Sequence, residues 1–255
     1  MNATQPTTMK LLPIYWLESK MEVLKMIRSP GFAISSLMFP VMFYTFFGLL
    51  FTMSAANMST YMLATYGTFG VIGPALMSFG VGVSVERGQG WFDVKEASPM
   101  PASAYIVARI AVSLVFSTAI ILCLFTLGAT FGGVSLLQSQ WLLLALVLML
   151  GSLPFCAIGL AMGLSMKSST APAVVNLTYL PMSFLSGLWV PINAFPESLQ
   201  TVAHFMPPFH LAQLALKTID MDIGGNVWLH LGALLAYGLI FFALAAKAYS
   251  KKDKS

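Results

Sequence analysis

Long apolar runs separated by short polar stretches dominate this sequence. No charged residue occurs between Gly31 and Val85, or between Ile110 and Met166. A helix needs about 20 apolar residues to cross a bilayer, so each of these two runs is long enough for two crossings. With two further apolar runs towards the C-terminus, the pattern predicts six membrane-spanning helices, at 32–53, 61–85, 104–131, 141–164, 174–190 and 227–246.

The composition agrees with this pattern. Of 255 residues, 58% are hydrophobic and 9% are charged, and the mean hydropathy is +0.82. A water-soluble domain of this length could not bury so much apolar surface in one core. The fold class predicted is therefore an all-α integral membrane protein. Cys123 and Cys156 lie inside apolar runs, where they are expected to pack as small hydrophobic residues.

Residues 1–30 precede the first predicted span and are expected to form a tail followed by an amphipathic helix. Between Leu11 and Arg28, helical periodicity places most apolar residues on one side and the acids Glu18 and Glu22 on the other. This pattern is typical of a helix that lies on a membrane surface. The residues assigned to this interfacial helix are Leu17, Met21, Leu24, Lys25 and Arg28.

A polar stretch at 86–103 separates the second and third predicted spans. Acids and bases alternate in it around Trp91, Phe92 and Val94. A short amphipathic helix here could offer exposed aromatic side chains to another protein, which a plain solvated loop would not need. We therefore predict a docking element, with candidate residues Glu86, Arg87, Gly90, Trp91, Phe92, Asp93 and Lys95.

Prolines and aromatic residues crowd the segment 183–210, between the fifth and sixth predicted spans. Prolines break helices, and Trp and Phe favour the membrane interface, so this backbone is expected to bend at the membrane surface rather than cross it. A short amphipathic piece is predicted between the prolines, within the region 191–226. The residues at these bends, to which the family resemblance described below assigns the role of a gate, are Trp189, Pro191, Phe195, Pro196, Pro207 and Pro208.

The distribution of basic residues predicts the orientation. With six spans, every Lys and Arg except Lys217 falls on the side that holds both termini. By the positive-inside rule, both termini and the 86–103 loop are cytoplasmic, and 191–226 lies outside. Residues 31–247 then form the transmembrane domain and 248–255 a basic cytoplasmic tail. Arg109, near the start of the third span, is expected to reach the interface.

Motifs for chemistry on this chain are missing. The closest match to a phosphate-binding loop, Gly163 to Ser168, has Met166 where a Gly must precede the Lys. His204 and His210 have no third ligand at a spacing suited to zinc. Few ionisable groups lie at mid-membrane depth, which argues against ion coupling. Sodium can be bound by carbonyls and hydroxyls alone, so a gradient-driven secondary transporter stays open as an alternative.

The order of these features resembles the membrane subunits, or permeases, of type 2 ATP-binding-cassette (ABC) exporters, the ABC-2 family. The likeness is carried by the amphipathic N-terminal helix and by fragments in the same order along the chain: Glu86-Arg87, Gly90, Ser98-Pro99, Tyr105 and Arg109, then Ser186 to Pro191, Phe195-Pro196, Leu199-Gln200 and Pro207-Pro208. The resemblance implies a transporter subunit and not an enzyme. It also implies that ATP and Mg²⁺ bind a separate ATPase subunit rather than this chain.

The resemblance implies a role for each of the segments identified above. The 86–103 loop would form a coupling helix that enters a cleft on the ATPase, with the N-terminal helix beside it. Residues 192–215 would form short helices and the outer gate, and two permease copies, a homodimer or heterodimer, would enclose the pathway. The expected function is export across a bacterial inner membrane, with lipids and no nucleic acid as partners. The cargo expected is a drug-like or lipid-type molecule, as in multidrug efflux, and a lipid-linked glycan is the alternative cargo.

Overall fold

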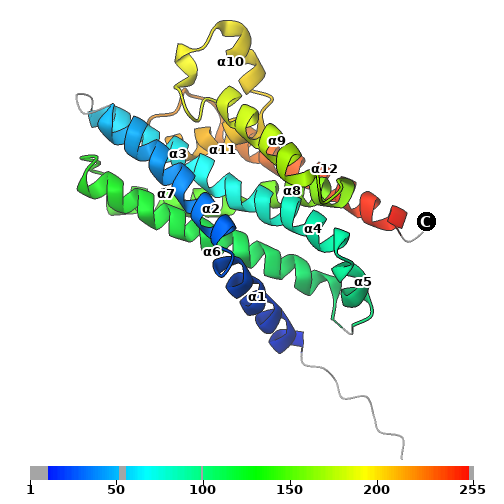
Figure 1. Ribbon diagram of the computed structural model, residues 1–255. Helices are drawn as coiled ribbons and strands as arrows, with labels where there is room; N and C mark the ends of the chain where they lie inside the picture. The colour runs from blue at the N-terminus through cyan, green and yellow to red at the C-terminus, as the bar shows by residue number, and fades with distance from the viewer. Residues whose placement is uncertain (1–10, 52–55, 99, 253–255) are drawn as a thin grey trace, which may run out of the picture.

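The computed structural model describes residues 11–51, 56–98 and 100–252. Over these residues the chain folds into helices without any strand, which confirms the all-α part of the predicted fold class. Most long helices run side by side in one bundle (Figure 1). The helices are α1 (Leu11–Ile27), α2 (Pro30–Phe43), η1 (Tyr44–Leu50), α3 (Ala56–Leu76), η2 (Met77–Gly82), α4 (Val83–Gly88), α5 (Trp91–Glu96), α6 (Ala102–Thr130), α7 (Gln138–Gly151), α8 (Leu153–Ser165), α9 (Ala171–Leu185), η3 (Ile192–Ala194), α10 (Glu197–Ala203), α11 (Pro207–Lys217) and α12 (Val227–Lys252).

In the described part of the chain, five helical segments are long and apolar enough to cross a membrane. They are Pro30–Leu50, Asn57–Gly88, Ala102–Thr130, Gln138–Ser165 and Val227–Tyr249. These match five of the six predicted spans. The remaining predicted span, 174–190, corresponds to α9, which has 15 residues. At 1.5 Å per residue α9 is about 22 Å long, shorter than the apolar core of a bilayer, which is about 30 Å thick. A sixth crossing by this helix alone is therefore not supported.

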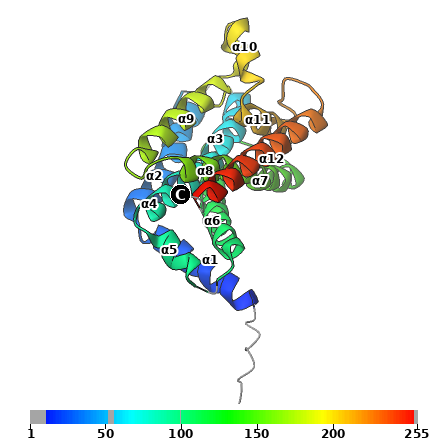
Figure 2. The same ribbon diagram turned by 90° about the vertical axis from the view of Figure 1, so that its right-hand side faces the viewer.

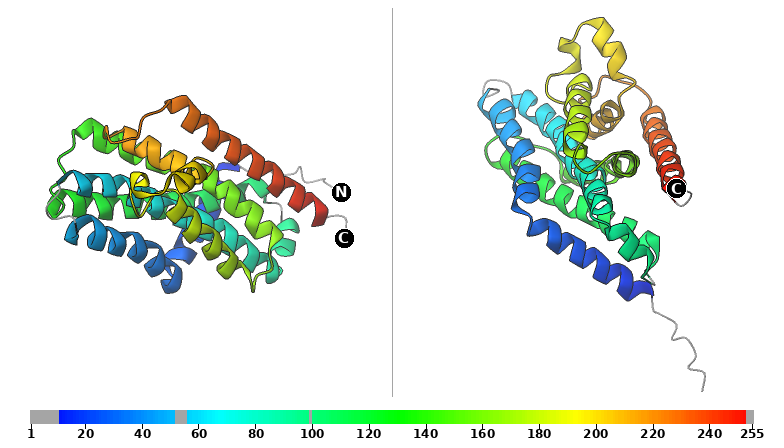
Figure 3. Two further views of the ribbon diagram at one scale, coloured as in Figure 1. Left: turned by 90° about the horizontal axis from the view of Figure 1, so that it is seen from above. Right: turned by 45° about the vertical axis from the view of Figure 1, so that its right-hand side comes forward.

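The two ends of the bundle carry different elements. Helices α4 and α5, the start of α6 and the last turns of α12 lie at one end, which we call the α5 end (Figure 3, left). The first turns of α3 and α7 lie at the other end, called the α7 end (Figure 3, left). The sequence predicts that the α5 end faces the cytoplasm.

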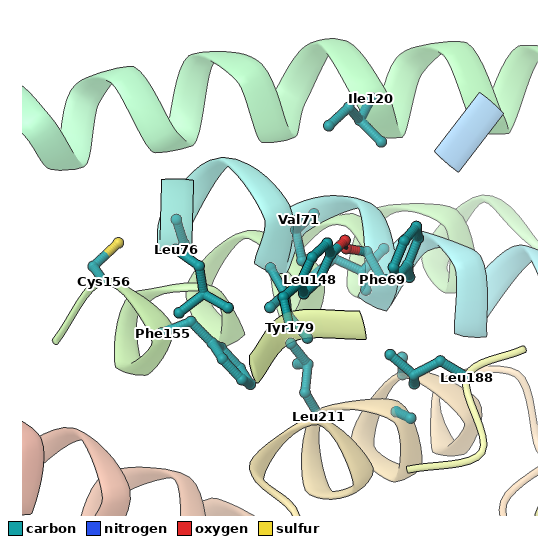
Figure 4. Close-up of a cluster of buried hydrophobic side chains, with 14 of the residues drawn as sticks. Phe69, Val71, Leu76, Ile120, Leu148, Phe155, Cys156, Tyr179, Leu188 and Leu211 are labelled. Carbon is teal, nitrogen blue, oxygen red and sulfur yellow. Dashed lines mark hydrogen bonds between the residues drawn. The ribbon is translucent and has the colours of Figure 1, made fainter. Parts of the chain in front are cut away.

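Helix α3 lies at the centre of the bundle, and in the segment Asn57–Gly88, which begins with α3, 72% of the most apolar stretch is buried. Its own buried side chains, such as Phe69, belong to one hydrophobic core with side chains from α6, α7, α8, α9 and α11, including Ile120, Leu148, Phe155, Tyr179 and Leu211 (Figure 4). Glycines on α8 let η2 approach closely, since a Cβ atom at Gly163 would lie 2.4 Å from the carbonyl oxygen of Phe79. Small residues at such contacts are a common way to pack helices within a membrane.

The N-terminal segment forms the helix α1, which packs along the first turns of α6. The Tyr15 hydroxyl lies 2.6 Å from Ser103 Oγ, at the start of α6. Polar Glu22 is buried against the protein, whereas apolar Leu17 and Met21 are exposed. An apolar outer face suits contact with lipid, but the location of α1 at the membrane surface remains a prediction.

The region between α9 and α12 contains the predicted short helices η3, α10 and α11. Helix α10 protrudes from the bundle, as Figures 1 and 2 show. Helix α11 instead packs against α3, α7 and α12 and is buried along nearly its whole length. Pro207 and Pro208, expected at an exposed bend, form the buried first turn of α11, where proline is well tolerated.

Candidate functional site

A buried cluster of charges at the α5 end centres on Arg109 of α6. The Arg109 side chain is fully buried. Its Nη2 lies 2.6 Å from Glu86 Oε1 and 3.7 Å from Glu22 Oε2. Its Nη1 donates a hydrogen bond to the Ser78 carbonyl oxygen at 3.1 Å. These contacts join α6 to α4, α1 and η2, and they compensate the cost of burying a charge.

The position of Arg109 corrects the expectation that its side chain reaches the membrane interface. A long basic side chain near the end of a span can extend to water when no partner is nearby. Here the acids Glu86 and Glu22 lie on neighbouring helices, so the guanidinium turns into the protein. Arg109 is therefore part of the internal framework of the bundle.

Gly82, at the end of η2, makes room for the guanidinium. A Cβ atom at this position would lie 2.4 Å from Arg109 Nη1. The wide turn of the π-helix η2 also supplies the Ser78 carbonyl that Arg109 binds. Segments of π-helix inside α-helices are frequent at functional sites. This one provides the space and the carbonyl oxygen that the buried Arg109 side chain needs.

Glu86 of α4 is shared between two neighbouring helices. It is 5% exposed. The Tyr105 hydroxyl of α6 donates to Glu86 Oε2 at 2.8 Å, and Lys25 of α1 forms an ion pair with Glu86 Oε1. Lys25 also lies 3.5 Å from Glu22. A movement of α4 would therefore act on both α1 and α6.

Arg87, the next residue, connects α4 to α8. Its guanidinium donates hydrogen bonds to the carbonyl oxygens of Leu164 and Met166, at the end of α8. The Ser84 hydroxyl donates to the same Met166 oxygen at 3.1 Å. The last carbonyls of a helix lack partners within it, so a basic side chain there stabilises the helix end.

Helix α5 has one buried and one exposed side. Gly90, with a φ of +77°, makes the turn that leads into it. Phe92 is buried and packs edge-to-face on Tyr105, with ring centroids 5.5 Å apart. Trp91 and Val94 are 52% and 60% exposed. The side chains of Asp93 and Lys95 lie outside the described residues.

The predicted coupling residues therefore separate into two groups. Trp91 lies on the surface, where another protein can reach it, whereas Glu86 and Phe92 are buried and Arg87 is half-buried. Phe92 holds α5 to α6, and Arg87 holds α4 to α8. Of the predicted interfacial residues, Lys25 joins the buried cluster, Leu24 is half-buried, and the others, Leu17, Met21 and Arg28, are exposed.

Sequence reasoning missed the contribution of Glu22 and the pairing of Arg109. Glu22 and Lys25 are three residues apart on α1, and Tyr105 and Arg109 are four apart on α6. Each spacing places two polar side chains on one face of a helix, at the edge of an apolar run. That signal could have indicated that the two faces meet.

The predicted gate residues do not form a single cluster. Trp189 stacks on Phe43 of α2 at 5.3 Å and lies edge-to-face against Phe69 of α3 at 5.6 Å. Phe195 packs on Phe184 of α9 at 5.4 Å. Pro191 and Pro196 precede η3 and α10, respectively. Pro207 and Pro208 lie apart from these residues, in α11.

A cavity of about 490 Å³ lies among α2, α3 and α9. Apolar and aromatic side chains form most of its wall, including Phe39 and Phe69. Ser35, Asn176 and Tyr179 add a few polar groups, and Tyr179 stacks on Phe69 at 4.9 Å (Figure 4). Apolar walls with a few fixed polar groups suit an uncharged amphipathic molecule.

Two histidines at the start of α11 and α12 also meet inside the protein. The Nδ1 atoms of His210 and His230 are 2.9 Å apart, so one ring donates a hydrogen bond to the other. Among the described residues, no group of three or more His, Cys, Asp or Glu side chains is arranged to hold a metal ion. The sequence did not indicate this pair, because 19 residues separate the two histidines.

The five long apolar helices in the described residues indicate a multi-pass membrane protein. The family model described as "ABC-2 type transporter" matches residues 15–219. The chain therefore belongs to the ABC-2 type transporter family, as the sequence resemblance indicated.

Individual relatives agree with this membership. The chain is 26% identical over 239 residues to "Putative transport permease YvfS" of Bacillus subtilis (strain 168), covering 92% of this chain and 97% of that protein. It is also similar to "Nodulation protein J" of Rhizobium leguminosarum bv. viciae, with 34% identity, and of Sinorhizobium fredii (strain NBRC 101917 / NGR234), with 33% identity. Each of these two matches spans 70 residues, 28% of this chain and 27% of the relative.

Proposed function

We propose that this chain is the membrane-spanning subunit of an ATP-driven exporter in a bacterial inner membrane, with both termini cytoplasmic. A separate ATP-binding subunit would hold ATP and Mg²⁺ and supply the energy. The observation that carries the proposal is the buried cluster of Arg109, Glu86, Glu22 and Lys25, which joins α4 to α1 and α6. Helix α5 follows α4 directly and packs on the same cluster through Phe92 and Tyr105. Membership of the ABC-2 family supports it.

The exposed side of α5 is the proposed contact with the ATPase. Trp91 and Val94 offer apolar surface to the partner, and large aromatic residues often dominate the binding energy of such contacts. The opposite side of α5 is anchored by Phe92 on Tyr105, whose hydroxyl binds Glu86. A push on α5 would therefore move α4, α1 and the start of α6 as one unit. Such rigid-body movement of packed helices is a common form of conformational change.

The proposed pathway passes along the cavity among α2, α3 and α9. One chain provides only part of the wall, so two permease copies, identical or different, would enclose the route. The lining favours hydrophobic or amphipathic cargo, such as a drug-like compound or a lipid-type molecule, including the lipid part of a lipid-linked glycan. Trp189 and Phe195, packed near the far end of α9, would form the outer gate.

Affinity purification from the native membrane in mild detergent tests the division into two subunits. We expect a stoichiometric chain with a phosphate-binding loop to co-purify with the wild type. The Trp91→Ala variant should no longer co-purify with this ATP-binding chain, because the substitution removes the exposed aromatic anchor. Trp228→Ala is the matched control, since Trp228 is 77% exposed at the start of α12. Purification of the chain without an ATP-binding partner would contradict the proposal and favour the gradient-driven transporter.

A further inference from the structure

A second cavity, of about 290 Å³, lies among α5, α6, α8 and α12 at the α5 end. Its wall includes Phe92 of α5, Ile106 of α6, Leu160 and Leu164 of α8, and Phe242 and Tyr249 of α12. Among the described residues, no charged side chain lines it. Tyr105 also lines the cavity, and its hydroxyl is bound to Glu86. Apart from the hydroxyls of Tyr105 and Tyr249, the lining side chains present apolar groups to an occupant.

The mouth of this cavity lies on the outer surface of two candidate spans. Ala102 at the start of α6 and Ala246 of α12 line the cavity and are exposed, and Phe242 is 50% exposed. The outer surface of a span contacts the hydrocarbon region of the membrane. Lipid is therefore the surrounding medium at this mouth.

The volume of the cavity and the basic residues near it indicate which kind of molecule it can bind. Sites for drug-sized ligands occupy about 300–1,000 Å³, so this cavity lies at the lower limit and suits a slender chain. Lys247 follows the lining residue Ala246, and the sequence of α12 ends in Lys251 and Lys252. Basic residues at the end of a span attract anionic lipid headgroups, by about 1 kcal/mol per residue near the surface.

We propose that the cavity binds one acyl chain of an anionic phospholipid whose headgroup lies beside the basic end of α12. The acyl chain fills the space behind Phe92 and supports α5 from the side opposite Trp91 and Val94. Lipid binding thereby stabilises the docking helix in the position that the structure shows. This inference needs only the membrane location of the chain, so it holds or fails independently of ATP-driven export.

Native mass spectrometry of the full-length chain tests the proposal. The protein is delipidated in detergent and then mixed with phosphatidylglycerol or with phosphatidylcholine. We expect one phosphatidylglycerol per chain to be retained at least tenfold more strongly than phosphatidylcholine. Ala246→Trp, which fills the mouth, should abolish this preference. Ala243→Trp, at an exposed position of α12 that does not line the cavity, should keep it. Equal retention of both lipids, or equal behaviour of the two variants, would overturn the proposal.

Photo-crosslinking of the wild type tests the location without any substitution. Phosphatidylglycerol with a photoreactive group on its acyl chain is added to the same protein, and the modified peptides are sequenced. We expect adducts on α5 and on the last turns of α12, around Phe92, Phe242 and Tyr249. Adducts confined to other helices would overturn the assignment, even if Ala246→Trp failed to fold.

Discussion

Arg109 of α6 and Glu86 of α4 form a buried ion pair, with 2.6 Å between Nη2 and Oε1. Both side chains lie at the α5 end of the bundle, next to the helix proposed to contact an ATPase. Removing one partner of a buried pair leaves an uncompensated charge, which costs about 3–5 kcal/mol. The pair therefore fixes how α4 and α6 sit relative to one another.

Arg109→Leu should strongly destabilise the protein, because Glu86 and Glu22 would lose their buried partner. We expect a loss of about 3–5 kcal/mol and a clear fall in the unfolding temperature measured in detergent. Arg28→Leu, at an exposed position on α1, is the control and should change stability by less than about 0.5 kcal/mol. Equal unfolding temperatures for the two variants would contradict the structural role of Arg109.

Gly82→Ala should disturb the same cluster from the opposite side. The added Cβ would lie 2.4 Å from Arg109 Nη1, so the guanidinium or η2 must shift. Overpacking of this kind costs about 1–3 kcal/mol. Gly232→Ala on α12 meets no atom within 4 Å and should be neutral or slightly stabilising. The unfolding temperatures of both variants, measured in the same detergent, provide the comparison. A Gly82→Ala protein with the unfolding temperature of the wild type would contradict the packing described.

Glu86→Gln should lower the stability of the protein, whereas Trp91→Ala should weaken docking of the ATPase and leave stability unchanged. Glu86 is internal, so losing its charge should lower the unfolding temperature. Trp91 is exposed, so Trp91→Ala should leave stability within about 0.5 kcal/mol. The same variant should weaken ATPase binding by about 2 kcal/mol, roughly 30-fold. Unfolding and titration with the purified ATPase measure the two effects. A Trp91→Ala protein that binds the ATPase normally would exclude the docking surface proposed.

Stability should fall in acid because of His210. Burial, the largest cause, and the neighbouring His230 together lower the pKa of His210 to about 4, and His204 contributes smaller effects in both directions. Unfolded His has a pKa of about 6.5. Below pH 6.5 the unfolded chain therefore binds a proton at His210, whereas the folded chain does not bind one until about pH 4. The contribution of neutral His210 to the free energy of unfolding is therefore lost as the pH falls from 6.5 to 4.

Unfolding temperatures between pH 7.5 and pH 4 measure this effect. The difference between wild type and His210→Gln should be constant above pH 7 and should shrink as the pH falls from 6.5 towards 4. Lys217 and Asp222, which lie near His230, remain in both proteins and cancel in the comparison. If the difference in unfolding temperature between the two proteins does not change with pH, His210 has the same pKa in the folded and unfolded states, and the prediction is wrong.

Hydropathy predicted most of the fold because it reports removal from water. It located five crossing segments to within a few residues, including Ala102–Thr130 against the predicted 104–131. It does not distinguish burial in lipid from burial in protein. Helix α11 carries Gln213 and two prolines, so it resembled a surface segment, although the bundle encloses it.

The site was harder to predict, because pairing depends on which helix faces meet. The sequence placed Glu86 and Arg87 in a polar loop, where both looked available to a partner. In the structure α4 continues the second span to Gly88, past its predicted end at 85, and carries both side chains into contacts with α1, α6 and α8. Trp91 was predicted to be an exposed anchor, and the turn at Gly90 leaves its side chain on the surface.

Transport by proteoliposomes that contain the chain and its co-purifying partner tests the central claim most directly. Efflux of a hydrophobic dye should require ATP, persist when an ionophore removes the ion gradients, and disappear in Trp91→Ala but not in Trp228→Ala. Efflux that collapses with the ion gradient and continues without ATP would contradict the account.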